Sequence, residues 1–209
     1  GIHIINLEET IRCIEKADKE ISKITNSGGN ILFVGTKNQV KDVVQEAADA
    51  CGMFYIVERW LGGTLTNFAT IKKSIKRLEK LEKESSSLYK NLTKKETIML
   101  ERERIKLSDL HRGIKDMKYI PSAVFVVDVK LEKIAVDEAK VLGIPVFGIV
   151  DTNTNPNLID YPIPANDDSI KTVKLILNYF VDSINSQNLS KKNEELSKVD
   201  SAAIKEEKK

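Results

Sequence analysis

Four short runs of consecutive apolar residues constrain the fold of this chain more than any other feature of its sequence. They occupy residues 31–34, 54–57, 123–127 and 146–150. No charged residue interrupts any of them, which is typical of strands that are covered on both faces. Segments with helical periodicity separate the runs, so that strands and helices alternate along the chain. This order predicts a parallel sheet with helices on both of its faces.

The segment between the second and third runs departs from this alternation. Residues 68–119 carry two helical patterns in succession, both too charged to form a core. Helices joined in this way most simply fold back on each other as an antiparallel hairpin. We therefore predict a doubly wound α/β domain of four or five strands, formed by residues 1–67 and 120–185, with an inserted helical hairpin at 68–119. Residues 186–209 are rich in charge and poor in large apolar groups, which predicts a disordered tail.

Positive charge is concentrated in the predicted hairpin. Residues 71–119 hold 15 Lys and Arg against 8 Asp and Glu, whereas the whole chain has a formal net charge of only +2. A basic segment on a mildly acidic body is typical of a surface that binds a polyanion. A solvated pair of charged helices explains the same pattern, so composition alone leaves both interpretations open.

Two further features narrow the class of protein. No run of 18 apolar residues occurs, which argues against a membrane-spanning helix and a membrane partner. Cys13 and Cys51 are the only cysteines, and they have neither the spacing of a metal site nor that of a disulfide framework. We therefore expect a reducing, cytoplasmic environment.

The segment after the first apolar run is the place to look for a nucleotide site, because ligands of parallel sheets bind beyond the carboxyl ends of the strands. Gly35-Thr36-Lys37 stands there, but the preceding residues do not complete a phosphate loop, and no GxGxxG motif occurs. We favour Thr36 as the N-cap of the following helix over a nucleotide site.

Acidic residues follow two other runs. Asp128 and Asp151 end neighbouring predicted strands, and Asp167 and Asp168 open the last predicted helix. Such carboxylates could hold Mg²⁺ or accept a phosphoryl group. Neither a nucleophile nor a partner base accompanies them, and we predict no catalytic residue, no metal and no cofactor.

The segment 59–67, Arg-Trp-Leu-Gly-Gly-Thr-Leu-Thr-Asn, joins the second run to the hairpin and holds the only tryptophan. The N–H groups of Gly62 and Gly63 could face phosphate oxygens. Arg59 and Asn67 could donate hydrogen bonds to an RNA backbone or to base edges. A structural loop packed over Trp60, with Asn67 capping the next helix, explains the same residues.

The same segment closely resembles the bacterial small-subunit ribosomal protein S-two family. The resemblance continues through Thr70-Ile71 and Ser74-Ile75-Lys76-Arg77-Leu78, and it extends over about residues 1–183. Further similar blocks are Gly1-Ile2-His3-Ile4-Ile5, Phe33-Val34-Gly35-Thr36-Lys37, Pro121-Ser122-Ala123, Leu142-Gly143-Ile144-Pro145, Asp151-Thr152-Asn153 and Asn166-Asp167-Asp168. Several independent blocks at the right separations make the resemblance highly specific.

The resemblance implies a flavodoxin-like α/β domain with a protruding coiled-coil hairpin and no enzymatic activity. It implies a structural constituent of the small ribosomal subunit in the cytoplasm, bound to ribosomal RNA between head and body. Neighbouring small-subunit proteins become expected partners, among them ribosomal protein S-one, whose docking supports translation initiation. Under this interpretation the strand-end aspartates are scaffold residues.

Cations and loop residues of the inserted region become the expected RNA contacts, because cations bound to phosphates supply much of the affinity for RNA. The expected contacts are Arg59, Trp60, Gly62, Gly63, Asn67, Lys72, Lys73, Lys76, Arg77, Arg102, Arg104, Arg112, Lys115 and Lys118. Little base specificity is expected from contacts to A-form RNA.

The chain departs from the family at its beginning. Family members carry a further few dozen residues before the Gly1-Ile2-His3 box, and these are absent here. We expect the sequence to be a truncated form. Two other functions stay open as alternatives: a phosphate- or nucleotide-binding flavodoxin-like enzyme with its ligand at Thr36, Asp128 and Asp151, and an adaptor that uses the hairpin to bind protein.

Overall fold

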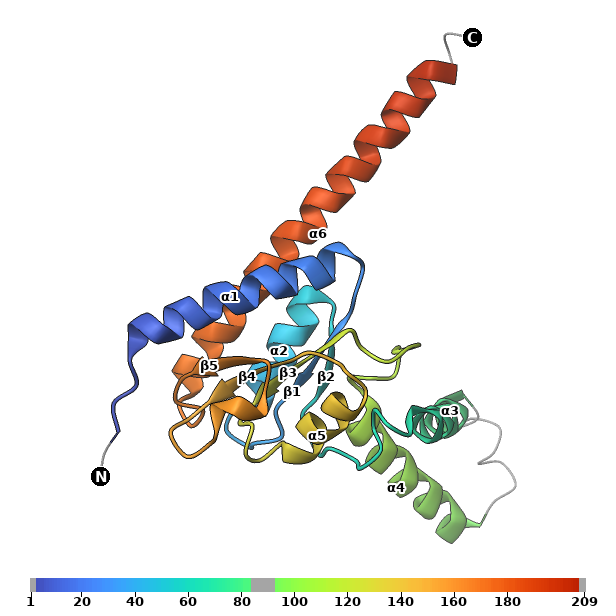
Figure 1. Ribbon diagram of the computed structural model, residues 1–209. Helices are drawn as coiled ribbons and strands as arrows, with labels where there is room; N and C mark the ends of the chain where they lie inside the picture. The colour runs from blue at the N-terminus through green and yellow to red at the C-terminus, as the bar shows by residue number, and fades with distance from the viewer. Residues whose placement is uncertain (1–2, 84–92, 207–209) are drawn as a thin grey trace.

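A five-stranded, wholly parallel sheet forms the centre of the computed structural model (Figure 1). The structure describes residues 3–83 and 93–206. The strands are β1 (Ile31–Val34), β2 (Phe54–Ile56), β3 (Ala123–Val127), β4 (Val146–Val150) and β5 (Tyr161–Pro164), in the spatial order β2-β1-β3-β4-β5. The four predicted strands and the doubly wound α/β fold are confirmed.

The strand β5 lies outside the four apolar runs. It pairs with β4 in the register Val150↔Pro164. Pro162 and Pro164 lack the N–H that a central strand needs, so this sequence is tolerated only at the edge of a sheet. The two prolines conceal the strand from an analysis based on apolar runs, although they are compatible with its edge position.

Helices on one face of the sheet enclose the larger core. They are α1 (Leu7–Asn26), α2 (Lys41–Cys51) and α6 (Ile170–Glu206). Phe33 and Phe125 point to this face, with their ring centroids 5.5 Å apart, and Phe180 of α6 packs on Phe125 at 5.2 Å. These rings are almost fully buried, and burial of aromatic surface is a dominant stabilising term in such a core.

The opposite face is covered by α5 (Lys133–Val141) and by the first half of α3 (Phe68–Lys83), while the short helix η2 (Pro156–Leu158) precedes β5. Phe68, Ile71 and Ile75 of α3 are buried in the same cluster as Trp60 and Leu65. The expectation that the inserted helices stay outside the core is therefore wrong for the beginning of α3, where apolar residues at spacings of three and four face the body.

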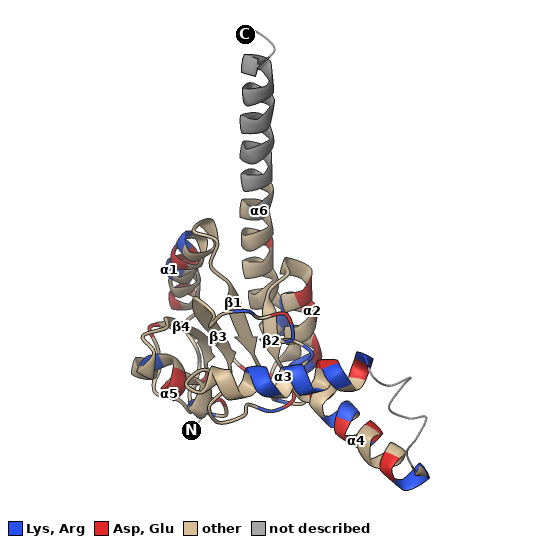
Figure 2. Ribbon diagram, turned by 90° about the vertical axis from the view of Figure 1, so that its right-hand side faces the viewer, with Lys and Arg blue, Asp and Glu red and all other residues tan. Residues whose placement is uncertain are grey.

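The helices α3 and α4 (Lys94–His111) project together from one end of the body (Figures 1 and 2). They run in different directions and pack on each other where they cross. The helix α4 ends at His111 rather than near Tyr119 as the pattern predicts. Gly113 follows, and its carbonyl oxygen accepts a hydrogen bond from the N–H of Tyr55 at 3.1 Å, which ties the chain to β2 at the edge of the sheet.

The last helix also differs from the prediction. The helix α6 continues to Glu206, beyond the end at Ser183 that the pattern predicts. Neither Gly nor Pro, the two residues least favourable inside a helix, occurs from Ile170 onwards. In Figure 1 this helix extends well away from the sheet. Among the described residues, no helix is long and apolar enough to cross a membrane.

Candidate nucleic-acid interface

The exposed side of α3 carries a row of lysines, which we call the α3 basic face: Lys73, Lys76, Lys80 and Lys83. Their spacing of three, four and three residues places them on one side of a helix, and all four are exposed. Figure 2 shows the basic positions recurring along α3. The opposite side of the helix carries Ile75 and Leu78, which are buried, so packing fixes which side faces solvent.

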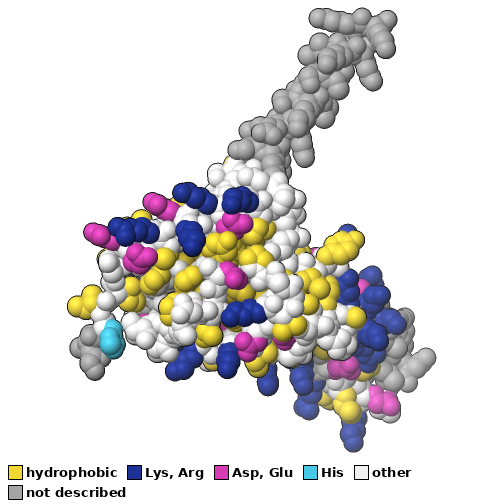
Figure 3. Space-filling model, in the orientation of Figure 1, with side chains coloured by type: hydrophobic (Ala, Val, Ile, Leu, Met, Phe, Trp, Pro, Cys, Tyr) yellow, Lys and Arg dark blue, Asp and Glu magenta, His cyan; other side chains and the backbone are white. Residues whose placement is uncertain are grey.

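The four lysines have no acidic partner within 4 Å among the described residues. In the space-filling view, Lys and Arg side chains gather over the end of the molecule that α3 and α4 form (Figure 3). An uncompensated row of cations on a rigid helix attracts phosphate groups and releases their counterions on binding.

Four other predicted contacts are held in ion pairs. Arg77 forms two hydrogen bonds with Glu103 of α4, at 3.0 and 3.1 Å. The other three ion pairs are Arg104 with Glu101, Arg112 with Glu58, and Lys115 with Glu82. These pairs are partly exposed, so each contributes little stability. They reduce the charge that is available to a phosphate, and the pair Arg77–Glu103 joins α3 to α4.

Lys72 differs from the other predicted contacts because its ammonium packs within the protein. Its ammonium donates a hydrogen bond to the carbonyl oxygen of Lys118. It also lies 5.0 Å from the ring centroid of Phe68 and 5.7 Å from that of Tyr119. Contacts of this kind are typical of a cation that holds two segments together, and we assign Lys72 to packing. Lys118, Arg59 and Arg102 are exposed.

The segment 59–67, which we call the Trp60 loop, is organised around one carboxylate. Glu138 of α5 accepts hydrogen bonds from Trp60 Nε1 at 3.0 Å, from the N–H of Gly63 at 2.7 Å and from the N–H of Leu65 at 2.9 Å. The N–H and the hydroxyl of Thr66 add two more, both at 3.1 Å. The N–H of Gly63 therefore has a partner within the protein, which favours the interpretation of this segment as a structural loop.

The remaining loop residues agree with a structural loop. Trp60 is buried, whereas Gly62 and Asn67 are exposed. The side-chain oxygen of Asn67 accepts a hydrogen bond from the Thr70 hydroxyl at 2.9 Å, at the beginning of α3. Burial by itself raises the pKa of Glu138, but the hydrogen bonds from Trp60 and from the loop N–H groups outweigh it and lower the pKa below its ordinary value.

The position where a nucleotide site was considered is filled by a second carboxylate. Glu132, which is 3% exposed, accepts hydrogen bonds from the N–H and the hydroxyl of Thr36 at 2.8 and 2.5 Å. Burial raises the pKa of Glu132, and its hydrogen bonds with Thr36 oppose the rise. Because the donors that would hold a phosphate are satisfied internally, this end of β1 is not suited to bind one.

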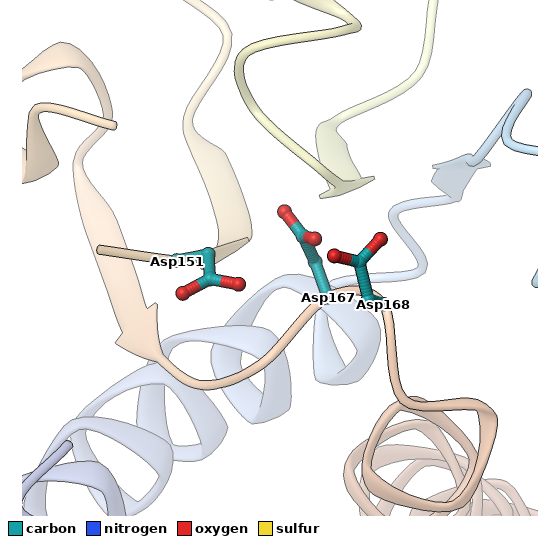
Figure 4. Close-up of side chains that lie close together, drawn as sticks. All are labelled: Asp151, Asp167 and Asp168. Carbon is teal, nitrogen blue, oxygen red and sulfur yellow. The ribbon is translucent and has the colours of Figure 1, made fainter. Parts of the chain in front are cut away.

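Lys37 gathers the strand-end aspartates into an ionic cluster. Its ammonium lies 3.5 Å from Asp128 and 3.0 Å from Asp167, and it contacts Asp168 as well. Burial alone would lower the pKa of Lys37, but the hydrogen bonds with Asp168 and Asp167 raise it. Figure 4 shows Asp151, Asp167 and Asp168 close together, with carboxylate oxygens within 4.8 Å of one another. In this structure the positive charge among them comes from Lys37.

Three important residues escaped the sequence analysis. Lys80 and Lys83 continue the α3 basic face, and their regular spacing from Lys73 and Lys76 was the signal that could have identified them. Glu138 belongs to the residues that resemble the family, but no local pattern predicts its role, because its partners lie in a loop more than 70 residues away. It could be found only once the fold was known.

An α/β body with a projecting pair of basic helices is the arrangement that the resemblance to a family of ribosomal proteins implies. The family model Ribosomal protein S2 matches residues 1–187. The chain is 50% identical over 186 residues to small ribosomal subunit protein uS2 of Fusobacterium nucleatum, covering 88% of this chain and 75% of that protein. It is 56% identical over 178 residues to the protein of that name from Onion yellows phytoplasma, covering 85% and 66%. The chain therefore belongs to the ribosomal protein S2 family, as the resemblance implied.

Proposed function

We propose that this chain is a structural constituent of the small ribosomal subunit that binds ribosomal RNA through the α3 basic face. The observation that carries the proposal is the row Lys73, Lys76, Lys80 and Lys83, exposed along one side of α3 without acidic partners among the described residues. Side chains of this kind bind the phosphate backbone and read its shape rather than its bases.

The attachments of the helix pair to the body support this proposal. The Trp60 loop is fixed to α5 through Glu138, and Gly113 is fixed to β2 through Tyr55. Both ends of the inserted segment are therefore anchored to the sheet domain. A basic face held in a defined orientation loses less conformational entropy on binding than a flexible basic tail does.

The finer details of the function rest on the resemblance to the family. We propose that the chain binds RNA between the head and the body of the small subunit, in the cytoplasm. We further propose that it contacts neighbouring proteins, including ribosomal protein S-one, and thereby supports translation initiation.

Co-sedimentation with small-subunit particles that lack this protein tests the RNA-binding surface. The variant carries Lys73→Glu, Lys76→Glu and Lys80→Glu, which reverse the charge of the α3 basic face while the buried side of the helix stays unchanged. We expect its affinity to fall by about a hundredfold or more at moderate salt.

The matched control reverses three exposed lysines on the other side of the sheet: Lys16→Glu, Lys19→Glu and Lys171→Glu. It changes the net charge of the chain by the same amount. Equal losses in the two variants would mean that only net charge matters, and would contradict the proposed surface. Full binding by the first variant would contradict it as well.

A further inference from the structure

A hollow on the far side of α4 is distinct from the α3 basic face. It has a volume of about 430 Å³ and lies between the segment 58–59 and α4. Its lining residues are Glu58, Arg59, Arg102, Ile105, Lys106, Asp109 and Leu110. The spacing of the α4 members places them on one side of the helix, whereas Glu103 and His111 contact α3.

We propose that this hollow binds one unpaired nucleotide of RNA. The inference rests on the proposed function, because it takes RNA as the partner of this helix pair, and it goes further by naming a second contact of different chemistry. A row of lysines suits a continuous phosphate backbone. A hollow with an apolar floor suits a base that has been turned out of a helix.

The charge of the hollow favours an anion. Arg59, Arg102 and Lys106 are exposed at its rim and have no acidic partner among the described residues. Glu58 is already compensated, because it pairs with Arg112 at 3.1 Å and with Lys41 at 3.5 Å. Asp109 is therefore the only uncompensated acid among the seven lining residues, and the rim remains positive.

The floor of the hollow favours a base over a bare phosphate. Ile105 is 48% exposed although it lies on a highly charged helix, and Leu110 lies beside it. Apolar surface of this kind gains nothing from a phosphate, but it can be covered by the flat face of a base. The guanidinium planes of Arg59 and Arg102 can stack on the same base. The Asp109 carboxylate can accept a hydrogen bond from a ribose hydroxyl or an exocyclic amino group.

The two walls of the hollow are held in place before any ligand binds. Arg59 precedes Trp60, whose indole is fixed to Glu138. Arg102 and Lys106 lie on α4, and the ion pair between Arg112 and Glu58 links the end of that helix to the other wall. A shallow site whose two sides are anchored in this way loses less conformational entropy on binding than one formed by unanchored segments.

Methyl NMR of the full chain tests the proposal through the Ile105 and Leu110 signals. The probes are a mixed-sequence single-stranded RNA hexanucleotide, a blunt-ended duplex that contains the same sequence, and inorganic phosphate. We expect the single strand to shift both signals, whereas the duplex and the phosphate leave them in place. Ile11 lies on α1, on the other face of the sheet, and is 57% exposed, so its methyl signal is the internal reference.

A paired substitution tests the rim. Arg59→Ala with Arg102→Ala should weaken binding of the single strand by about tenfold, whereas Lys94→Ala with Lys95→Ala, in the first turn of α4, should change it by no more than about twofold. Unchanged signals outside the hollow show that a variant is folded. The Ile105 response is measured on the unaltered chain, so this test holds even if a variant fails to fold.

Absence of an Ile105 shift when the single strand is in excess overturns the proposal, as does an equal shift with duplex or phosphate. These outcomes separate the hollow from the α3 basic face. If the unaltered chain binds small-subunit particles but Ile105 does not respond to the single strand, the hollow is ruled out and the α3 basic face is retained. If Ile105 responds to the single strand but charge reversal on α3 leaves particle binding unchanged, the α3 basic face is ruled out and the hollow is retained.

Discussion

The carboxylate of Glu138 accepts a hydrogen bond from Trp60 Nε1 at 3.0 Å, although the two residues lie 78 positions apart in the sequence. The same carboxylate binds the N–H groups of Gly63, Leu65 and Thr66. One acidic side chain on α5 therefore organises the loop that leads into α3. The orientation of the basic helix is a consequence of this buried contact.

Glu138→Gln should destabilise the fold by roughly 2–4 kcal/mol, because an amide cannot accept all of these hydrogen bonds and leaves buried N–H groups without partners. Urea unfolding monitored by Trp60 fluorescence measures the loss. The neighbouring substitution Asp137→Asn is the control, since Asp137 is exposed, and it should change the stability by less than about 0.5 kcal/mol. Similar losses for the two variants would refute the role of Glu138.

Gly113→Ala should be strongly destabilising at the place where α4 meets the sheet. A Cβ atom at Gly113 would lie 2.2 Å from the carbonyl oxygen of Tyr55, a rigid backbone atom. We expect a loss of roughly 2 kcal/mol or more from this overpacking. The control is Gly62→Ala, where a Cβ would meet nothing within 4 Å. Thermal unfolding of the two variants decides the point, and a Gly113→Ala protein as stable as the control would count against this contact.

Stability should fall as the pH decreases through the range in which histidine titrates. His111 is 1% exposed, its Nε2 lies 2.8 Å from the Ser74 hydroxyl, and burial lowers its pKa. The folded pKa is therefore below the unfolded value of about 6.5. The contribution of neutral His111 is complete above the unfolded pKa and is lost as the pH falls through the folded pKa.

Urea unfolding between about pH 8 and pH 5 measures this dependence. His111→Gln should reduce the slope over this interval, whereas His3→Gln, at an exposed position, should leave it unchanged. A slope that persists in His111→Gln would show that another group is responsible.

Lys37→Met should expose the repulsion within the strand-end cluster. Without the ammonium, Asp128 and Asp167 lose their shared positive partner, and Asp167 is 2% exposed. Removing one partner of a buried ion pair costs roughly 3–5 kcal/mol, and we expect the lower end of that range because the Lys37 side chain is 21% exposed. Lys174→Met removes a solvent-exposed pair with Glu46, and it should cost less than about 1 kcal/mol. Calorimetric unfolding at neutral pH measures the loss of stability in each variant. Equal losses in the two variants would refute the role of Lys37.

Four of the five strands were predictable because each is marked by a short run of apolar residues in the sequence. Runs such as 31–34 and 123–127 are apolar at every position, and a strand that is buried on both faces requires that pattern. The strand β5 was not predictable in this way, since Pro162 and Pro164 oppose a strand everywhere except at an edge. The helix α6 extends past Ser183, where the apolar periodicity that predicts it ends.

The sequence predicts which segment forms the candidate interface, but it predicts only some of the residues in that interface. The local excess of Lys and Arg identifies the inserted segment. The helical spacing of its lysines predicts one exposed row, which includes Lys80 and Lys83. Spacing cannot reveal which cations are already paired, as Arg77 is with Glu103 across two helices. Nor can it reveal that a distant carboxylate, Glu138, occupies the N–H groups of the Trp60 loop.

The salt dependence of binding to small-subunit ribosomal RNA tests the central claim most directly. The logarithm of the affinity is measured against the logarithm of the salt concentration for the unaltered chain and for a variant with Lys73, Lys76, Lys80 and Lys83 changed to Ala. We predict that the slope becomes less steep by about 0.7–0.9 for each phosphate contact removed, or by about 3 in all. An identical slope for the two proteins would contradict the assignment of the α3 basic face as the RNA-binding surface.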